Sequence, residues 1–343
     1  MTDDLLEALD PGPDAPDGAV EAVYVSRDGK PVAAVNASDV AFPWLCAGKP
    51  IMAAAMLRLT HEPGGPDLDD PVSRYVPELD RPDKRDIRIS DLLTHRTGIT
   101  REPIPRGWPD EKILGWIAGS PVEDTQGEPN YGMFSSWYLL GRVIERVTGR
   151  HRTQAADELV LRPLGLRVGF GGGGPAGRPE QPLLAAVDGR FDRPQPLGWI
   201  TDPVVLEAAW AGVGMWGPMD TLARFYDALA RPEEQSVPAS LAAALADLGR
   251  PVGSGMRSWD NDTDDWSYST GAYTGSAWIG RGFAHSVIGL DAATGTLGLA
   301  DPVNGVVVVY GTTVMRLTAP VLVRRRRIVD AAYRACGLTA FPR

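Results

Sequence analysis

Residues 42–57 read FPWLCAGKPIMAAAML, and this stretch places a cysteine and a lysine at the start of an apolar helix. Pro50 fits the first turn of a helix, where its missing N–H costs nothing. Cys46 therefore lies within a turn of a helix N-terminus, where free N–H groups and the helix dipole stabilise a thiolate. Lys49, three residues later, projects from the same face and can contact the sulfur.

Lys49 differs from the other lysines of the chain in its surroundings. Lys30, Lys84 and Lys112 stand in polar segments typical of loops, whereas Lys49 has apolar neighbours. Desolvation in such surroundings favours the neutral amine, which is the form that can act as a base. The alternative is a buried, inert cysteine beside a lysine whose stem is buried and whose ammonium group reaches water.

Strand-like runs lie near both ends of the chain, and apolar residues at helical spacing fill the middle. One pair of runs, 20–25 and 32–35, is joined by Ser26-Arg27-Asp28-Gly29, and Asp-Gly between such runs favours a hairpin. A second pair, 295–300 and 306–310, is also joined by a turn. The expected helices cover 50–59, 90–93, 136–147, 220–230 and 318–336.

These positions predict an α/β (α+β) fold, in which both chain ends form one antiparallel sheet flanked by helices. We expect residues 1–18, which hold three prolines and five aspartates, to be a flexible leader before a single domain at 19–343. Its sheet lobe would take in about 19–45 and 265–343, and an inserted helical lobe about 46–264. The arginines at 324–327 are interpreted as a solvated helix face.

Several motifs, in order along nearly the whole chain, resemble the class C β-lactamase-like family. This family includes serine β-lactamases, penicillin-binding proteins, D-alanyl peptidases, esterases and acyltransferases. Cys46-Ala47-Gly48-Lys49 stands where the family has Ser-x-x-Lys. Its further signature segments are similar to LDDPVSRYVPEL at 68–79, ISDLLTHRTGI at 89–99, LLGRVIERVTG at 139–149 and RPLGL at 162–166. The resemblance implies a β-lactamase/transpeptidase-like fold.

The resemblance also implies two further catalytic elements. Tyr131-Gly132-Met133 stands for the family's Tyr-x-Asn, which makes Tyr131 the phenol that relays a proton between nucleophile and leaving group. Met133 replaces the asparagine, and the adjacent Asn130 is the candidate to supply an amide in its place. The segment 283–287 resembles the His form of Lys/His-x-Gly, which makes His285 a candidate catalytic residue. The alternatives are a loop aromatic for Tyr131 and a structural histidine for His285.

In the family, the strand with His-x-Gly supplies one of two backbone N–H donors that bind the oxyanion. Valine stands here where the family has glycine, and it can still donate its N–H although it narrows the approach of a substrate. His95, in the segment 89–99, is assigned to packing of the helical lobe. The residues expected to bind substrate are Trp44, Asn130, Ser286, Val287 and Ile288.

A cysteine nucleophile changes the chemistry that the resemblance implies. Cys46 would form a thioester where the relatives form an ester, and amines attack thioesters far more readily than water does. We therefore predict an intracellular acyltransferase in natural-product biosynthesis, which forms an amide or ester through a thioester on Cys46. The expected partners are a small-molecule acyl donor (an ester or thioester), an amine or alcohol acceptor, and a carrier protein as a further possible donor.

Two other functions remain open. The first is an esterase, amidase or β-lactamase-like hydrolase that uses the cysteine, because hydrolases are abundant in the family. The second is a non-catalytic binding protein in which Cys46 has replaced a lost serine, and Met133 and Val287 are further departures that favour it. Retention of Lys49 and Tyr131 argues against this second alternative.

Composition disfavours several other classes. The formal net charge of −10 argues against a nucleic-acid or anionic-membrane partner, whose binding needs a cationic surface. The two cysteines, Cys46 and Cys336, form no disulfide framework, and the four histidines show no metal-ligand spacing. No apolar run approaches the roughly 20 residues of a membrane helix, and the acidic start has no signal-peptide pattern. We expect a cytoplasmic protein without metal or cofactor.

Overall fold

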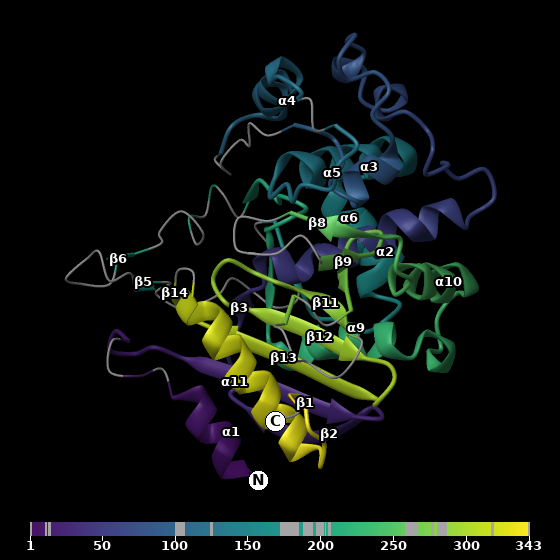
Figure 1. Ribbon diagram of the computed structural model, residues 1–343. Helices are drawn as coiled ribbons and strands as arrows, with labels where there is room; N and C mark the ends of the chain where they lie inside the picture. Colours follow the sequence, from purple (N-terminus) through teal and green to yellow (C-terminus); the bar gives the residue numbers. More distant parts are fainter. Residues whose placement is uncertain are drawn as a thin grey trace.

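The computed structural model describes residues 2–10, 12, 15–99, 107–123, 126–171, 185–187, 195–196, 202, 204, 207–257, 266–275, 278–279, 287–316 and 319–341 (Figure 1). Its centre is an eight-stranded sheet in the order β2-β1-β13-β12-β11-β10-β9-β8, in which every neighbouring pair is antiparallel. The strands are β1 (Glu21–Arg27), β2 (Lys30–Val35), β8 (Gly253–Met256), β9 (Trp266–Tyr268), β10 (Tyr273–Thr274), β11 (Ile288–Asp291), β12 (Leu297–Asp301) and β13 (Val306–Thr312).

Pairing between the two ends of the chain closes the middle of this sheet. β1 lies beside β13 over seven residues, from Glu21 opposite Thr312 to Arg27 opposite Val306. Asp28 and Gly29 both have positive φ, 50° and 71°, as a two-residue type I′ hairpin between β1 and β2 requires. The predicted fold class, with one antiparallel sheet built from both ends of the chain, is confirmed.

Helices cover both faces of the sheet, and β13 faces both layers. Val307 and Val309 belong to the apolar core that contains α2 and α9, whereas Val306 and Val308 pack into the core beneath α11. Successive side chains of a strand point to opposite faces, so a strand covered on both sides is apolar at every position. Figure 1 shows α11 (Ala319–Ala335) and α1 (Thr2–Leu9) together on one face.

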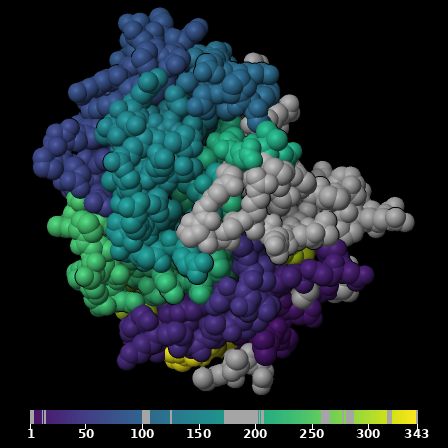
Figure 2. All heavy atoms as spheres, turned by 180° about the vertical axis from the view of Figure 1, so that it is seen from behind, coloured from purple at the N-terminus to yellow at the C-terminus, as the bar shows by residue number. Residues whose placement is uncertain are grey.

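The remaining elements form the helical lobe and two small sheets. The helices are α2 (Lys49–Thr60), α3 (Ile89–Leu93), α4 (Asp110–Gly119), α5 (Ser135–Thr148), α6 (Arg152–Ala156), α9 (Met219–Ala230) and α10 (Ala239–Leu248), with shorter turns η1 (Leu45–Gly48), η2 (Val72–Arg74), η3 (Pro77–Leu79), η4 (Asp157–Leu161) and η5 (Pro232–Glu234). The small sheets join β3 (Phe42–Pro43), β7 (Met215–Gly217) and β4 (Gly169–Phe170), and β14 (Val314–Arg316), β5 (Ala185–Val187) and β6 (Gln195–Pro196). From behind, residues of the helical lobe, blue to teal, fill the upper part of the surface (Figure 2).

Two details of the predicted domain organisation are wrong. Residues 2–9 are not a flexible leader, because they form helix α1, whose Leu5 and Leu9 side chains are buried in the core beneath α11. The sheet also takes in β8, which lies inside the range assigned to the helical lobe. Within the described helices, none combines the length and apolar character needed to cross a membrane.

The arginine run on α11 is only partly a solvated face. Arg325 is buried and pairs with Asp291 of β11. Arg324 donates from Nη1 to the carbonyl of Asp10 and from Nη2 to that of Leu9, at 2.9 and 3.1 Å. These two carbonyls belong to the last residue of α1 and the residue after it, so Arg324 attaches the N-terminal helix to α11.

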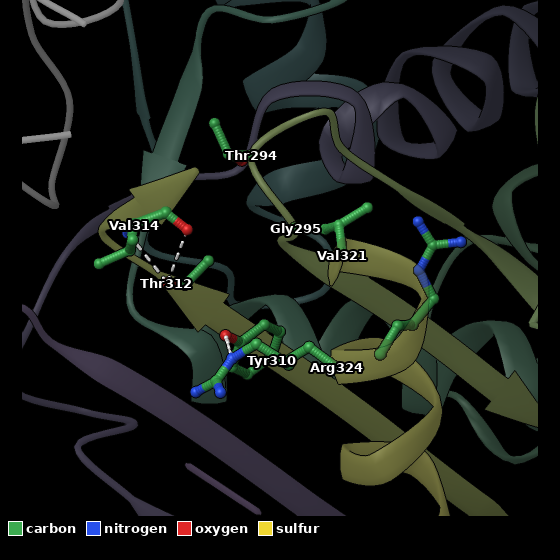
Figure 3. Close-up of a pocket in the computed structure, with 8 residues that line it drawn as sticks. Thr294, Gly295, Tyr310, Thr312, Val314, Val321 and Arg324 are labelled. Carbon is green, nitrogen blue, oxygen red and sulfur yellow. Dashed lines mark hydrogen bonds between the residues drawn. The ribbon is translucent and has the colours of Figure 1, made fainter. Parts of the chain in front are cut away.

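Arg324 also reaches the sheet (Figure 3). Its Nε donates to the Tyr310 hydroxyl at 2.9 Å, and its Nη2 lies 3.0 Å from Oε1 of Glu21. The Tyr310 hydroxyl in turn donates to Glu21, whose side chain is 4% exposed. A buried carboxylate without its cation keeps the full cost of desolvation.

We predict that Arg324→Ala lowers the stability of the fold strongly, by about 3–5 kcal/mol, because it removes the Arg324 cation from beside the buried carboxylate of Glu21. The thermal unfolding midpoint measures this loss. Arg327→Ala is the control, because Arg327 is exposed on the same helix and should cost less than about 0.5 kcal/mol. Equal midpoints for the two variants would contradict the role given to Arg324.

Candidate active site

The predicted nucleophile, Cys46, lies in the short turn η1 that leads directly into α2. The first hydrogen bond of this turn runs from the Ala47 N–H to the Trp44 carbonyl, so the Cys46 N–H comes before it. Leu45, immediately before Cys46, has a φ of 45°, which is a strained conformation for a branched residue. The side chain of Cys46 is largely buried, with 6% exposure. The helix start predicted from the sequence is therefore present.

Trp44 attaches this turn to strand β7. Its N–H donates to the Met215 carbonyl and its indole Nε1 donates to the Gly217 carbonyl, both at 2.9 Å and both on β7. The ring is entirely buried, with no surface to offer a ligand. The expectation that Trp44 binds substrate is therefore wrong. Its aromatic side chain lies in the core and supports the turn that carries Cys46.

Lys49 is the first residue of α2 and is completely buried. Its Nζ donates to the Tyr131 hydroxyl at 2.7 Å and lies 4.5 Å from the centre of the Tyr131 ring and 5.5 Å from that of Trp137. Gly212 makes room for this side chain, because a Cβ there would lie 3.1 Å from Cε of Lys49 and 2.9 Å from Cβ of Trp137. The amine is thus enclosed by aromatic side chains and aimed at a phenol.

Tyr131 connects Lys49 to Cys46. Burial raises the pKa of Tyr131 well above its ordinary value, and the neighbouring Cys46 raises it further. At neutral pH the side chain is therefore a protonated phenol, which has a proton to pass on. The structure brings together three of the four catalytic residues predicted from the sequence, because Tyr131 is hydrogen-bonded to Lys49 and packs in the cluster that contains Cys46.

His95 also lies at this site, although the sequence interpretation assigned it to packing of the helical lobe. Its ring lies 4.5 Å from that of Tyr131, measured between ring centres, and its Nδ1 accepts from the Gly132 N–H at 3.0 Å. Burial, followed by the nearby Lys49, lowers the pKa of His95 well below its ordinary value, so the imidazole is neutral. Its place in the segment 89–99 gave no indication of this contact, because the two residues are far apart in the chain.

The other predicted site residues are only partly placed. His285 and Ser286 lie outside the described residues. Val287 and Ile288, at the start of β11, are buried, and Val287 packs in the same apolar cluster as Cys46. Their side chains therefore face the core, which leaves backbone groups as their means of binding a substrate.

The segment around Tyr131 departs from the amide arrangement expected from the resemblance. Asn130 is exposed, and its N–H donates to the His95 carbonyl at 2.9 Å. Met133 is half-buried and packs against the core of the helical lobe. The proposal that Asn130 replaces the family's amide has no support from its exposed position.

A small pocket elsewhere in the molecule is separate from this site. It lies beside α11, between β13 and the turn at 292–296, and Thr294, Thr312 and Val321 are among the residues that line it (Figure 3). Its volume of about 10 Å³ is that of a single water molecule. Across the described ranges, no three His, Cys, Asp or Glu side chains are grouped so that they could hold a metal ion.

Comparison with known proteins identifies the family of the chain. The family model described as "Beta-lactamase" matches residues 14–333. Esterase EstB of Burkholderia gladioli is 30% identical over 297 residues, which are 75% of this chain and 69% of the esterase. A putative D-alanyl-D-alanine carboxypeptidase of Escherichia coli matches at 30% over 116 residues, which are 29% of this chain and 26% of that protein.

Solved structures with the same fold cover nearly the whole chain. EstCE1, described as a hydrolase with promiscuous acyltransferase activity, has a TM-score of 0.75 and 18% identity, over 95% of this chain and 98% of its own. A D-stereospecific amidohydrolase from Streptomyces sp. has a TM-score of 0.72 and 21% identity, over 99% of this chain and 100% of its own. At these identities the likeness establishes the fold alone. Together with the match to the family model, it shows that the chain belongs to the β-lactamase family.

Proposed function

We propose that the protein is a hydrolase of small esters or amides that works through an acyl group bound to Cys46. The observation that carries this proposal is the position of Tyr131, whose hydroxyl accepts a hydrogen bond from Lys49 and whose side chain packs in the cluster that contains Cys46. A phenol in that position can move a proton to or from the sulfur, and a donor on its far side stabilises the charge that develops on its oxygen. Membership of a family that includes an esterase supports the hydrolytic reaction.

In the first step, the sulfur of Cys46 attacks the carbonyl carbon of the substrate. The C–O or C–N bond breaks, and the thiol proton passes through Tyr131 to the leaving alcohol or amine. In the second step, water attacks the thioester carbonyl, the C–S bond breaks, and one proton of the water returns to the sulfur by the same route. Lys49 donates a hydrogen bond to the phenol oxygen during both transfers.

The oxyanion of each step needs donors that are fixed before the reaction. The Cys46 N–H precedes the first hydrogen bond of η1 and is a candidate donor. The backbone around the start of β11, just after Val287, which packs in the cluster that contains Cys46, is the candidate for the second. His285 and Ser286 directly precede this strand and remain proposed catalytic and binding residues.

Acyl transfer is the second candidate function, and the sulfur of Cys46 is the observation that favours it. A thioester reacts with amines much faster than with water, so an amine or alcohol acceptor that reaches the site would compete with hydrolysis. The acyl donor would be a small ester or thioester, including one presented on a carrier protein. The test is intact-mass spectrometry with p-nitrophenyl acetate and an added amine, which reports the acyl adduct on Cys46 and the ratio of the two products.

We predict that Lys49→Ala and Tyr131→Phe each lower kcat/KM for p-nitrophenyl acetate by about 10²-fold or more, because each breaks the proton path to the sulfur. Circular dichroism and the thermal midpoint check that the variants fold. Lys30→Ala is the matched control, because Lys30 is exposed on β2, and its rate should equal that of the native protein. Near-native turnover of Lys49→Ala would make the lysine structural.

We predict that Cys46→Ser gives a weak enzyme whose products shift toward hydrolysis. The hydroxyl is far less acidic than the thiol, so acylation slows, and the resulting ester resists amines more than the thioester did. The assay is competition between a fixed amine and water, with both products quantified. Cys336→Ser is the control, because Cys336 is buried at the end of α11 and burial raises the pKa of its thiol. An unchanged product ratio for Cys46→Ser would show that exclusion of water, and not the sulfur, decides the outcome.

A further inference from the structure

His95 occupies a backbone position that ordinarily favours glycine. Helix α3 ends at Leu93, Thr94 caps it, and His95 follows with a φ of 58°, in the left-handed region. Glycine is the usual residue at this position of a helix end, and asparagine is the next most readily accommodated. A histidine with this φ is strained, so the contacts that His95 makes with its surroundings must hold it there.

The hydrogen bonds that His95 makes go to the segment that carries Tyr131, and its ring also lies 5.8 Å from that of Trp137 on α5. The His95 carbonyl accepts from the Asn130 N–H at 2.9 Å, and the His95 Nδ1 accepts from the Gly132 N–H at 3.0 Å. The two bonds bracket Tyr131, and the imidazole lies against the phenol ring between them, at 33° to its plane. Because Nδ1 accepts, the proton of the neutral ring is on Nε2.

The opposite side of the same segment is held independently of His95. The Tyr131 N–H donates to the Arg257 carbonyl at 2.8 Å, and the Arg257 N–H donates to the Pro129 carbonyl at 3.0 Å. This pairing attaches the segment to the chain just after β8. Loss of the His95 side chain should therefore leave the segment attached and the protein folded, with the phenol free to shift relative to Lys49 and Cys46.

We infer that His95 is a positioning residue, whose side chain fixes the Tyr131 hydroxyl between Lys49 and Cys46 through the Gly132 N–H and the phenol ring. This inference rests on the proposed role of Tyr131 in moving a proton to and from the sulfur. It does not place His95 in contact with the substrate. A shift of about 1 Å in a proton-transfer group can cost about 10²-fold in rate.

Two variants of similar shape, both without the imidazole ring, differ in whether the side chain keeps a hydrogen-bond acceptor. His95→Asn keeps an oxygen that can accept from the Gly132 N–H and tolerates the left-handed backbone, whereas His95→Leu has the same branching without an acceptor. We expect kcat for p-nitrophenyl acetate to fall about 10²-fold in His95→Leu, with KM within about twofold, and to stay within about tenfold of native in His95→Asn.

A second readout needs no turnover. In a Cys336→Ser background, the rate at which iodoacetamide alkylates Cys46, followed by intact mass, reports the contact between the phenol and the sulfur. His95→Leu should shift this rate to the value of Tyr131→Phe, and His95→Asn should leave it near native. Thermal midpoints confirm that each variant is folded.

The inference is overturned if His95→Leu keeps the native kcat and alkylation rate, or if His95→Asn and His95→Leu lose both to the same extent. A native protein that hydrolyses no ester or amide would refute the proposed function instead. The alkylation rates would still decide whether His95 positions Tyr131.

Discussion

The complete burial of the Lys49 amine is the constraint on which the site depends. A buried nitrogen of this kind is costly unless it has hydrogen-bond and electrostatic partners. Tyr131 supplies the hydrogen bond, the faces of Tyr131 and Trp137 supply the electrostatic surroundings, and Gly212 supplies the space. Tyr131 and Trp137 lie around the start of α5, and Gly212 lies just before β7, so the amine can be buried only when these separate segments have packed around the start of α2.

The sheet provides the rigid frame against which this lobe is placed. β1 and β13 pair across the two ends of the chain, and helices cover both faces, so the strands next to the site have little freedom to move. The turn that carries Cys46 is fastened to β7 by Trp44, and β11 begins beside it. Strain at Leu45 and at His95 is tolerated because these surroundings hold both residues in place.

The proposed chemistry depends on the sulfur of Cys46, which stands where the family has a serine hydroxyl. Tyr131 stays protonated because burial and the neighbouring Cys46 both raise its pKa, which makes it a donor toward a leaving group. In the proposed mechanism, Lys49 donates a hydrogen bond to the phenol and His95 orients it. The balance between water and amine as final acceptor would then be set by the reactivity of the proposed thioester and by access to the site.

The sequence alone determined those features that depend on neighbouring residues. The Asp28-Gly29 hairpin, the β13 strand and the start of α2 at Cys46 and Lys49 follow from local turn chemistry, periodicity and the position of Pro50, and motif order identified the family and Tyr131. Only the tertiary structure decided which long-range contacts form. In the structure, Leu5 and Leu9 of α1 pack under α11, and Trp44 is buried in the core. Arg324 pairs with Glu21, and the His95 ring lies against that of Tyr131. These contacts join residues distant in the chain, and a side chain's partner across such a distance depends on the packing of every element between them.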